Sequence, residues 1–233
     1  MVKLSIVIPC YNEEKRIEKT LEVILKYLKS KKYSFELIVV NDGSKDNTEK
    51  VVRKFRKIKL ISYSPNQGKG YAVRKGVLNS KGDYVLFCDA DLSTPIEELE
   101  KLIKFVKDFD VVIASRAVKE SDVEALGYRK FIGRGFAFLV NLLAVRGIND
   151  TQCGFKLFTK EAARKIFSKQ RIDGWAFDVE LLFLARKFGY KIKEVGVKWK
   201  HHYHIGVTPA TQSFKMLREV LRVRWNYMIG KYD

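Results

Sequence analysis

The chain has 233 residues, and 46% of them are hydrophobic. That fraction is enough for a full core and excludes an intrinsically disordered protein. The 45 basic and 27 acidic residues give a net charge of +18, which favours anionic partners such as nucleotides, nucleic acid or anionic lipid. Surfaces rich in Lys and Glu are also common in heat-stable proteins, which is an equally good explanation of the charge.

Strand and helix patterns alternate through the first half of the chain. Apolar runs predict five strands, at residues 4–8, 35–40, 60–63, 84–88 and 110–114. Apolar residues at helical spacing predict intervening helices, around residues 17–28, 51–55, 72–78 and 96–106. Thr94-Pro95-Ile96-Glu97 matches a capping box with proline at the first helical position, which predicts the start of the last helix. This alternation predicts an α/β fold with a mostly parallel sheet.

The second half is less regular. Helical patterns occur at residues 131–145, 160–168, 178–188 and 212–227, and extended patterns at residues 156–158 and 192–199. No internal repeat, low-complexity tract or linker-like stretch divides the chain. We therefore expect a single domain over residues 1–233.

Cysteine usage and hydropathy indicate a cytoplasmic protein. Cys10, Cys88 and Cys153 are odd in number, have no zinc-like spacing and lie partly in apolar strands, which favours a reducing compartment. No signal-peptide pattern precedes the first strand, and no run reaches the roughly 20 apolar residues of a membrane span. We expect a protein that is either soluble or peripheral on the cytoplasmic face of a membrane.

The strand at residues 84–88 ends in two carboxylates, Asp89 and Asp91. Its unbroken apolar run predicts a strand covered on both faces, and ligands of open α/β sheets bind beyond the carboxyl ends of such strands. Two acids there need a cation, and oxygen ligands favour Mg²⁺ or Mn²⁺ shared with substrate phosphates. The pair predicts a metal–diphosphate site, provided that both side chains face one crevice with room for a ligand.

Polar residues follow other predicted strands as well. Tyr11, Asn12 and Glu13 follow the first strand, Asp42 the second and Arg116 the fifth. In a parallel sheet they would face the same crevice, where Asp42 could accept hydrogen bonds from a base or ribose and Arg116 could face phosphate. Asp and Asn are also ordinary turn residues, so Asp42 alone has a purely structural explanation too.

Two weaker signals concern phosphate and metal. Gly68-Lys69-Gly70 precedes a helix and could bring backbone amides and a lysine to a diphosphate, but it matches neither the P-loop nor the dinucleotide motif. His201, His202 and His204 cluster after the last predicted strand. At most one of them would reach the site, and simple exposure explains the cluster equally well.

The predicted helix at residues 212–227 carries apolar residues on one side and Lys215, Arg218 and Arg222 on another. Such a helix either lies on an anionic membrane surface or packs its apolar stripe on the domain. The apolar stretch from Phe136 to Val145 is a second candidate membrane contact. Nucleic acid is not expected as a partner, because the basic residues are dispersed and no zinc, helix-turn-helix or RNA-binding motif is present.

Several of these segments together resemble the inverting, GT-A-type family-two glycosyltransferases. They are Ile6–Glu14 (IVIPCYNEE), Val39–Ser44 (VVNDGS), Asn66–Gly70 (NQGKG) and Asp89-Ala90-Asp91. Asp150–Phe158 (DTQCGFKLF) and Phe177–Leu181 (FDVEL) are similar to the dolichyl-phosphate glucosyltransferase and mannosyltransferase group, and closer to its glucosyl members. The resemblance extends from about residue 4 to about residue 225.

The resemblance implies a nucleotide-sugar pocket beside a metal site. The nucleotide-sugar-binding residues would be Pro9, Tyr11, Glu13, Val40, Asp42, Lys69, Asp89, Ala90 and Asp91. The catalytic residues would be Asp89, Asp91, Arg116 and Arg134, with Asp91 and Asp89 holding Mg²⁺ or Mn²⁺. Residues up to about 120 would form the nucleotide-sugar half, and residues from about 121 to 233 the acceptor half.

Two departures from the family pattern affect these expectations. Asn41 stands where many relatives have a first acid, so the base contact is assigned to Asp42. Eukaryotic glucosyl members also carry a membrane anchor that has no counterpart here, which leaves surface docking as the expected membrane contact.

The resemblance implies transfer of a hexose from UDP-glucose or GDP-mannose to a polyprenyl phosphate by a single displacement. A lipid phosphate is already an anionic nucleophile, so it needs positioning more than deprotonation. A saccharide hydroxyl is the alternative acceptor; it would require a base, for which Asp178 and Glu180 are candidates. A non-catalytic module that binds lipid or nucleic acid is a third hypothesis, which the intact acid pair disfavours.

Overall fold

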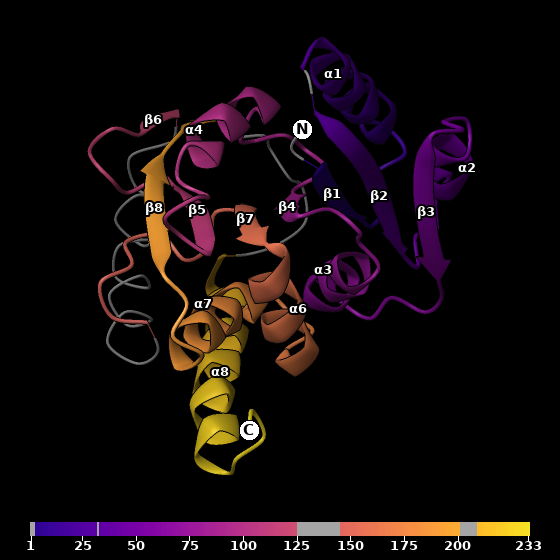
Figure 1. The fold of residues 1–233 in the computed structure, drawn as a ribbon. Coiled ribbons are helices and arrows are strands. Elements are labelled where there is room, and N and C mark those ends of the chain that lie inside the picture. The colour runs from indigo at the N-terminus through magenta and orange to yellow at the C-terminus, as the bar shows by residue number, and fades with distance from the viewer. Residues whose placement is uncertain (1–2, 32, 125–144, 201–208) are drawn as a thin grey trace.

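The computed structural model describes residues 3–31, 33–124, 145–200 and 209–233 (Figure 1). A seven-stranded sheet forms its centre, in the order β3-β2-β1-β4-β7-β5-β8. Its strands are β1 (Lys3–Cys10), β2 (Ser34–Asp42), β3 (Ile58–Tyr63), β4 (Tyr84–Cys88), β5 (Val111–Ser115), β7 (Phe155–Thr159) and β8 (Ile192–Gly196). A small second sheet pairs β6 (Asp122–Glu124) with β9 (Lys198–Lys200).

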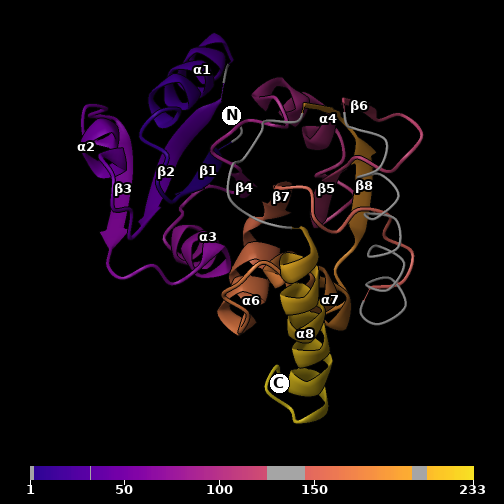
Figure 2. The same cartoon turned by 180° about the vertical axis from the view of Figure 1, so that it is seen from behind.

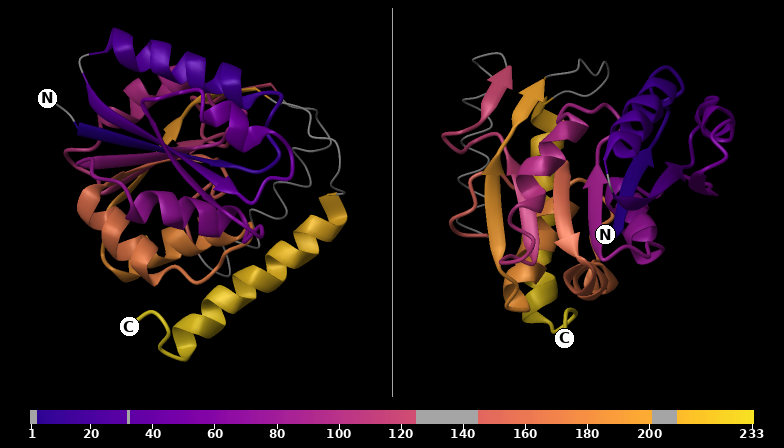
Figure 3. Two further views of the ribbon diagram at one scale, coloured as in Figure 1. Left: turned by 90° about the vertical axis from the view of Figure 1, so that its right-hand side faces the viewer. Right: turned by 45° about the horizontal axis from the view of Figure 1, so that its top comes forward.

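Helices cover both faces of the large sheet, with α1 and α4 on one face and α3, α6 and α7 on the other (Figure 3). The helices are α1 (Ile17–Ser30), α2 (Thr48–Val52), α3 (Lys69–Leu78), the 3₁₀ helix η1 (Ile96–Glu98), α4 (Leu99–Ile103), α6 (Lys160–Lys169), α7 (Phe177–Lys187) and α8 (Pro209–Met228). The predicted α/β fold with helices on a sheet is thereby confirmed.

Two hydrophobic cores, one on each face of the sheet, explain the unbroken apolar runs. Side chains alternate along a strand, so Val7 of β1 joins the core under α3 while Ile6 and Ile8 join the core under α1. Because both faces are buried, most positions on each face are apolar, and a buried polar side chain such as Ser5 or Lys156 is hydrogen-bonded within the protein.

The sheet is mostly parallel, as predicted, with one antiparallel strand inside it. β7 runs antiparallel between β4 and β5, and Phe155 pairs with Cys88. The sequence indicated only a short extended piece at residues 156–158. Because β7 runs in the opposite direction, its first residue lies at the carboxyl end of β4. This direction brings the segment before β7 to the acid pair.

Two sequence predictions of local structure were wrong. Pro95 has an extended backbone (ψ 144°) and precedes η1, and no side chain caps that helix. The Thr94 hydroxyl lies 3.5 Å from the Cys153 thiol instead of capping the helix. The strand predicted at residues 192–199 is two strands, because the chain leaves β5 after Gly196 and pairs next with β6.

The C-terminal helix predicted at residues 212–227 is confirmed as α8, which lies on the outside of the molecule (Figure 2). Within the described residues, no helix combines the length and the hydropathy that a membrane crossing requires. The helix predicted at residues 131–145 falls outside the described residues except for Val145, and so does the histidine cluster at residues 201–204.

Candidate active site

The polar residues predicted from the sequence lie along one edge of the sheet. β1, β2, β4 and β5 run in the same direction, so their carboxyl ends share this edge. Asp42 is the last residue of β2, Asp89 follows β4, and Arg116 follows β5. Each of these side chains has specific partners there, which determine what it can offer to a ligand.

The acid pair sits in a sharp turn after β4. The Asp91 carboxylate accepts a hydrogen bond from the Ser93 N–H at 2.9 Å. Leu92 has φ of 50°, in the left-handed region that non-glycine residues rarely adopt. The turn keeps Asp91 near the end of β4, two residues beyond Asp89.

Lys69, the first residue of α3, is the partner of Asp89. Its Nζ lies 2.5 Å from Asp89 Oδ1, and its ammonium group lies over the rings of Trp175 (5.4 Å) and Phe177 (5.9 Å). Burial lowers the pKa of Lys69, but the carboxylates of Asp89 and Asp178 outweigh burial, and the pKa is raised. The amine therefore stays charged and neutralises Asp89.

A second, fully buried ion pair lies next to Lys69. The Lys156 amine donates to the Asp178 carboxylate and, at 2.7 Å, to the carbonyl of Cys153. Burial raises the pKa of Asp178 in spite of the positive charges of Lys156 and Lys69. Lys156 lies on β7 and Asp178 on α7, so the pair ties these elements together beneath the acid pair.

The donor set suits a cation that shares its ligands with a substrate. Asp89 and Asp91 offer carboxylate oxygens, and the described residues contain no cluster of three or more His, Cys, Asp or Glu side chains placed to hold a metal. Mg²⁺ and Mn²⁺ are commonly bound by one or two carboxylates together with water and substrate phosphates. The residues present therefore fit such an ion, on condition that Lys69 releases Asp89.

Asp42 organises the loop that leads into α3. It is 2% exposed, and its carboxylate accepts hydrogen bonds from the Asn66 side chain (2.8 Å) and the N–H groups of Gln67 (2.8 Å) and Gly68 (3.0 Å). The N–H of Gly70 donates to the Asp173 carbonyl at 2.8 Å. Several amides that the sequence suggested for a diphosphate are thus already engaged within the protein.

The loop after β1 is fastened to the loop after β2. The Asn12 N–H donates to the Ser44 hydroxyl at 2.9 Å, and the Glu13 N–H donates to the Thr48 hydroxyl at 2.7 Å. Tyr11, between β1 and these contacts, is 43% exposed. Its ring is therefore accessible to a ligand at this edge.

Three further residues that were predicted to bind the nucleotide sugar have side chains that are buried or half-buried. Val40 is 0% exposed and Ala90 is 5% exposed, and Pro9 is half-buried. The Ala90 carbonyl accepts a hydrogen bond from the Thr20 hydroxyl at 2.6 Å. The side chains of Val40 and Ala90 therefore pack in the interior.

Arg116 is held by Asp150 in a bidentate ion pair. Its Nε and Nη2 donate to the two Asp150 carboxylate oxygens at 2.7 and 2.9 Å, and its guanidinium lies 5.3 Å from the centre of the Trp199 ring. Although burial opposes it, the Arg116 charge lowers the pKa of Asp150 to about 2. Arg116 thus contributes a fixed, largely neutralised charge at this edge.

A family model described as "Glycosyl transferase family 2" matches residues 5–167. The chain belongs to glycosyl transferase family 2. It is 39% identical to the dolichyl-phosphate beta-glucosyltransferase of Homo sapiens, over 99% of this chain and 77% of the human protein. The protein of the same name from Saccharomyces cerevisiae is 36% identical, over 98% of this chain and 76% of the yeast protein.

Solved structures support the GT-A-type fold of this glycosyltransferase. Glucosyl-3-phosphoglycerate synthase from Mycobacterium tuberculosis, crystallised with Mn²⁺, UDP-glucose and phosphoglyceric acid, matches with a TM-score of 0.72 at 19% identity, covering 99% of this chain and 80% of that chain. Mannosyl-3-phosphoglycerate synthase from Rubrobacter xylanophilus matches with a TM-score of 0.74 at 18% identity, covering 99% and 76%. At these identities the likeness extends to the fold alone.

Two residues near the acid pair of this transferase, Gly154 and Trp175, were not predicted as site residues from the sequence. The Asp89 N–H donates to the Gly154 carbonyl at 3.1 Å, and a Cβ on Gly154 would lie 2.1 Å from Asp89 Oδ2. Trp175 is 54% exposed beside Lys69. Gly154 lies in one of the recognised motifs, but only the antiparallel direction of β7 explains why a glycine is needed there.

The two candidate bases differ in what surrounds them. Glu180 is 0% exposed, and its carboxylate accepts hydrogen bonds from the N–H groups of Arg171 and Ile172 and from the Tyr232 hydroxyl. It therefore fastens the C-terminal segment to α7. Asp178 lies close to Lys69 but is paired with Lys156. Arg134, the remaining predicted catalytic residue, lies outside the described residues.

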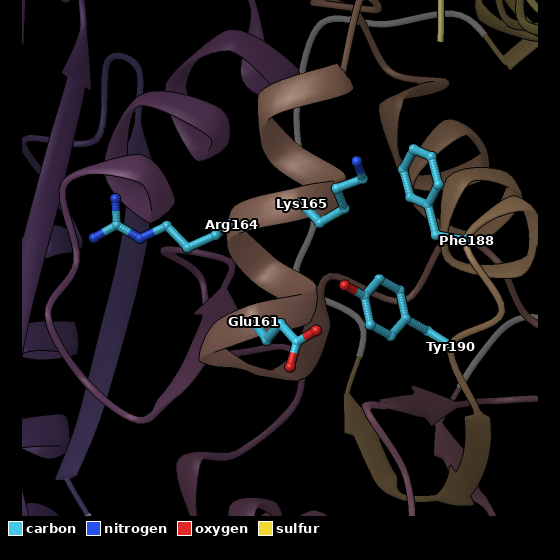
Figure 4. A pocket seen from close by; sticks show the side chains of 5 residues that line it. All are labelled: Glu161, Arg164, Lys165, Phe188 and Tyr190. Atoms are coloured by element: carbon cyan, nitrogen blue, oxygen red, sulfur yellow. The ribbon is translucent and has the colours of Figure 1, made fainter. Parts of the chain in front are cut away.

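A surface hollow elsewhere on the transferase is lined by Glu161, Arg164, Lys165, Phe188 and Tyr190 (Figure 4). α6 follows the end of β7, and this end lies at the amino-terminal edge of β4, where Thr159 pairs with Tyr84. The hollow is thus at the edge of the sheet opposite the acid pair, and it includes none of the predicted site residues.

Proposed function

We propose that this enzyme transfers glucose, with inversion, from UDP-glucose to dolichyl phosphate or a related polyprenyl phosphate. The observation that carries the proposal is the similarity of 98–99% of this chain to about three quarters of the dolichyl-phosphate beta-glucosyltransferases of Homo sapiens, Dictyostelium discoideum and Saccharomyces cerevisiae. The acid pair lies at the carboxyl-end edge of the sheet, where α/β folds bind their ligands.

In this proposal Asp89 and Asp91 hold a divalent cation, Mg²⁺ or Mn²⁺, together with the donor diphosphate. The cation supplies electrostatic stabilisation of the departing nucleoside diphosphate, an effect usually worth several kcal/mol. With a cation on Asp89, the Lys69 amine would be released from that carboxylate and would be available to a donor phosphate. Tyr11 and the loops after β1 and β2 border the base and ribose, with Asp42 keeping the second loop in place.

The acceptor needs positioning rather than a general base, because a lipid phosphate is already anionic. The arrangement of Asp178 agrees with this, since its carboxylate is committed to Lys156. Residues up to about 120 hold the donor and residues from about 121 onward hold the acceptor, with Arg116 at the boundary and Arg134 in the acceptor half. A membrane lipid as acceptor requires the enzyme to work at a membrane surface, and the three free cysteines support the cytoplasmic face as the proposed location.

A transfer assay tests the function directly. The purified enzyme is incubated with Mn²⁺, a radiolabelled donor and a polyprenyl phosphate in detergent, and the lipid product is extracted. We expect glucosyl lipid from UDP-glucose and little product from GDP-mannose. Product only on saccharide acceptors, or none with any donor, would overturn the proposal.

The acid pair is tested with a matched variant. Asp91→Asn should lower transfer by a factor of about 100 or more, since metal-assisted charge stabilisation is worth several kcal/mol. Asp83→Asn is the control, because Asp83 is an exposed carboxylate immediately before the other end of β4. Isothermal titration calorimetry of each variant with UDP in the presence of Mn²⁺ should show weakened binding for Asp91→Asn and unchanged binding for Asp83→Asn. Equal activity in both variants would contradict the assignment.

A further inference from the structure

α8 has two apolar faces, of which only one is used in folding. Val220 and Val223 are fully buried and belong to the core that includes α7. On the other side, Leu221, Trp225 and Met228 are 51%, 59% and 68% exposed. These three residues have the spacing i, i+4 and i+7, so they share one side of the helix. A helix that only packs on its domain needs a single apolar stripe.

The exposed apolar residues are concentrated on this helix. Among the described residues, five of the eight large apolar side chains that are well exposed lie on α8 or the turn after it: Leu221, Trp225, Tyr227, Met228 and Ile229. Tyr227 packs edge-on against Phe183 of α7, at 5.3 Å between ring centres, and so belongs to the inner side. We call Leu221, Trp225, Met228 and Ile229 the outer stripe.

Basic side chains border the outer stripe. At 100° per residue, Arg218 and Arg222 lie along one side of it and Arg224 along the other, and all three are exposed. Arg222 also interacts electrostatically with Asp173, and the Arg224 guanidinium lies 6.0 Å from the centre of the Phe183 ring. Residues 215–231 include five basic side chains and one acidic side chain, Glu219. The Glu219 carboxylate accepts a hydrogen bond from the Ala176 N–H at 2.9 Å, so it faces the body of the protein. The outward side therefore carries apolar and positive groups.

The position of α8 leaves the outer stripe accessible. The helix runs along the outside of the molecule next to α7, and its C-terminal end extends away from the sheet (Figures 2 and 3). α1, on the opposite face of the sheet, is on the far side of the molecule (Figure 3). A flat partner can thus approach α8 without meeting α1.

We propose that the outer stripe docks onto an anionic lipid bilayer, with α8 lying along the membrane surface. Trp and Met enter the interfacial region while flanking arginines meet lipid phosphates, which is how basic amphipathic helices bind membranes. A second copy of the chain fits less well, because a symmetric contact would place the arginine borders against each other. The choice of a bilayer rests on the proposed function, in which the acceptor is a membrane lipid.

Vesicle binding tests this surface separately from catalysis. The full chain is mixed with phosphatidylcholine vesicles that contain no or about 30% phosphatidylserine, and no dolichyl phosphate or donor, and co-sedimentation is measured. We expect binding to the anionic vesicles only, weakened by high salt. Arg218→Gln with Arg222→Gln should weaken binding about 25-fold, since each basic side chain near such a surface contributes about a factor of five.

Trp225 provides a direct reporter of contact. Brominated phosphatidylcholine added to the anionic vesicles should quench tryptophan fluorescence in the wild type, and Trp225→Phe should lose this quenching. Trp225→Ala with Met228→Ala should lower vesicle binding at least tenfold. Val23→Ala is the matched control, because Val23 is an exposed apolar residue (36%) on α1. Circular dichroism verifies that each variant is folded.

The outcomes separate the two proposals. Unchanged vesicle binding in the α8 variants, or a concentration-dependent dimer that Trp225→Ala abolishes, would overturn the docking surface. The same variants should retain transfer to a detergent-solubilised polyprenyl phosphate. If vesicle binding depends on the outer stripe but no lipid-linked glucose forms, the docking surface stands and the proposed function fails.

Discussion

Two carboxylates at the carboxyl-end edge of the sheet, those of Asp89 and Asp150, are neutralised in ion pairs, and the two pairs have different roles. Asp89 is paired with Lys69 at a partly exposed position, where a cation and a phosphate can exchange partners with them. Asp150 and Arg116 form a bidentate pair in which the aspartate is almost fully buried. The first pair can be opened by a ligand at modest cost, whereas opening the second would leave Asp150 buried and uncompensated.

The Asp150–Arg116 pair makes stability depend on pH. The folded pKa of Asp150 is lowered to about 2, below its unfolded value of about 3.9, so its stabilisation is complete above about pH 4 and is lost as the pH falls toward 2. The wild type should lose about 2–3 kcal/mol more unfolding free energy than Asp150→Asn over this range. Urea titrations at a series of pH values measure the difference. Parallel pH profiles would show that Asp150 is not stabilised in this way.

Gly154 is needed because Asp89 fills the space beside it. A Cβ there would lie 2.1 Å from the Asp89 carboxylate, so Gly154→Ala should displace that flexible side chain and weaken Mn²⁺–UDP binding at least tenfold. Gly189→Ala is the control: its Cβ meets nothing within 4 Å, but φ of 77° costs the variant about 1 kcal/mol. Calorimetry should show that only Gly154→Ala loses binding. Equal affinities would remove Gly154 from the site.

β7 and α7 are joined through one buried ion pair. Lys156 is completely buried and Asp178 nearly so. Among the described residues, no other ion pair joins β7 to α7. Such a pair contributes little net stability when it is intact, but loss of one partner leaves an uncompensated charge in the core.

Lys156→Met should therefore destabilise the protein by about 3–5 kcal/mol. Adding Asp178→Leu to this variant should recover at least half of the loss, because the buried carboxylate is removed along with its need for a partner. Urea unfolding monitored by circular dichroism provides both values. A double variant as unstable as Lys156→Met alone would mean that packing, rather than charge, determines the effect.

The whole molecule depends on strands from both halves of the chain. β7 lies between β4 and β5 and supplies the hydrogen bonds that join them. Residues of α6 and α7 complete the core on one face of the sheet. Without residues 121–233, the donor-binding half predicted from the sequence would therefore leave the edge of β4 that faces β7 unpaired. It would also leave one face of the sheet partly uncovered.

A fragment of residues 1–120 should consequently fail to fold by itself. It retains β1 to β5, but it lacks β7, α6 and α7 and so exposes apolar residues such as Phe87 that are fully buried in the complete chain. We expect no cooperative transition in urea, and strong binding of a hydrophobic dye. A sigmoidal unfolding curve like that of the full chain would contradict this expectation.

The parallel strands were predicted well from local patterns, because the length of a strand and the pattern of its apolar residues depend only on residues that are close in the sequence. The runs at residues 4–8 and 84–88 have side chains buried on both faces, and α1 and α8 follow helical apolar spacing. The capping box at Thr94 was wrong because the helix begins only after Pro95, which is extended, and the Thr94 hydroxyl contacts the distant Cys153 instead. A pattern four residues long does not reveal such a contact.

The sequence by itself determined the α/β class, the family and the acid pair at the end of β4, since these depend on residue types at fixed spacing. Only the tertiary structure decided that β7 is antiparallel, which places Gly154 against Asp89, and that Arg116 is committed to Asp150. It also decided which side of α8 is buried. These features depend on contacts between residues far apart in the chain, and neither hydropathy nor spacing encodes which partner a charged or apolar side chain will meet.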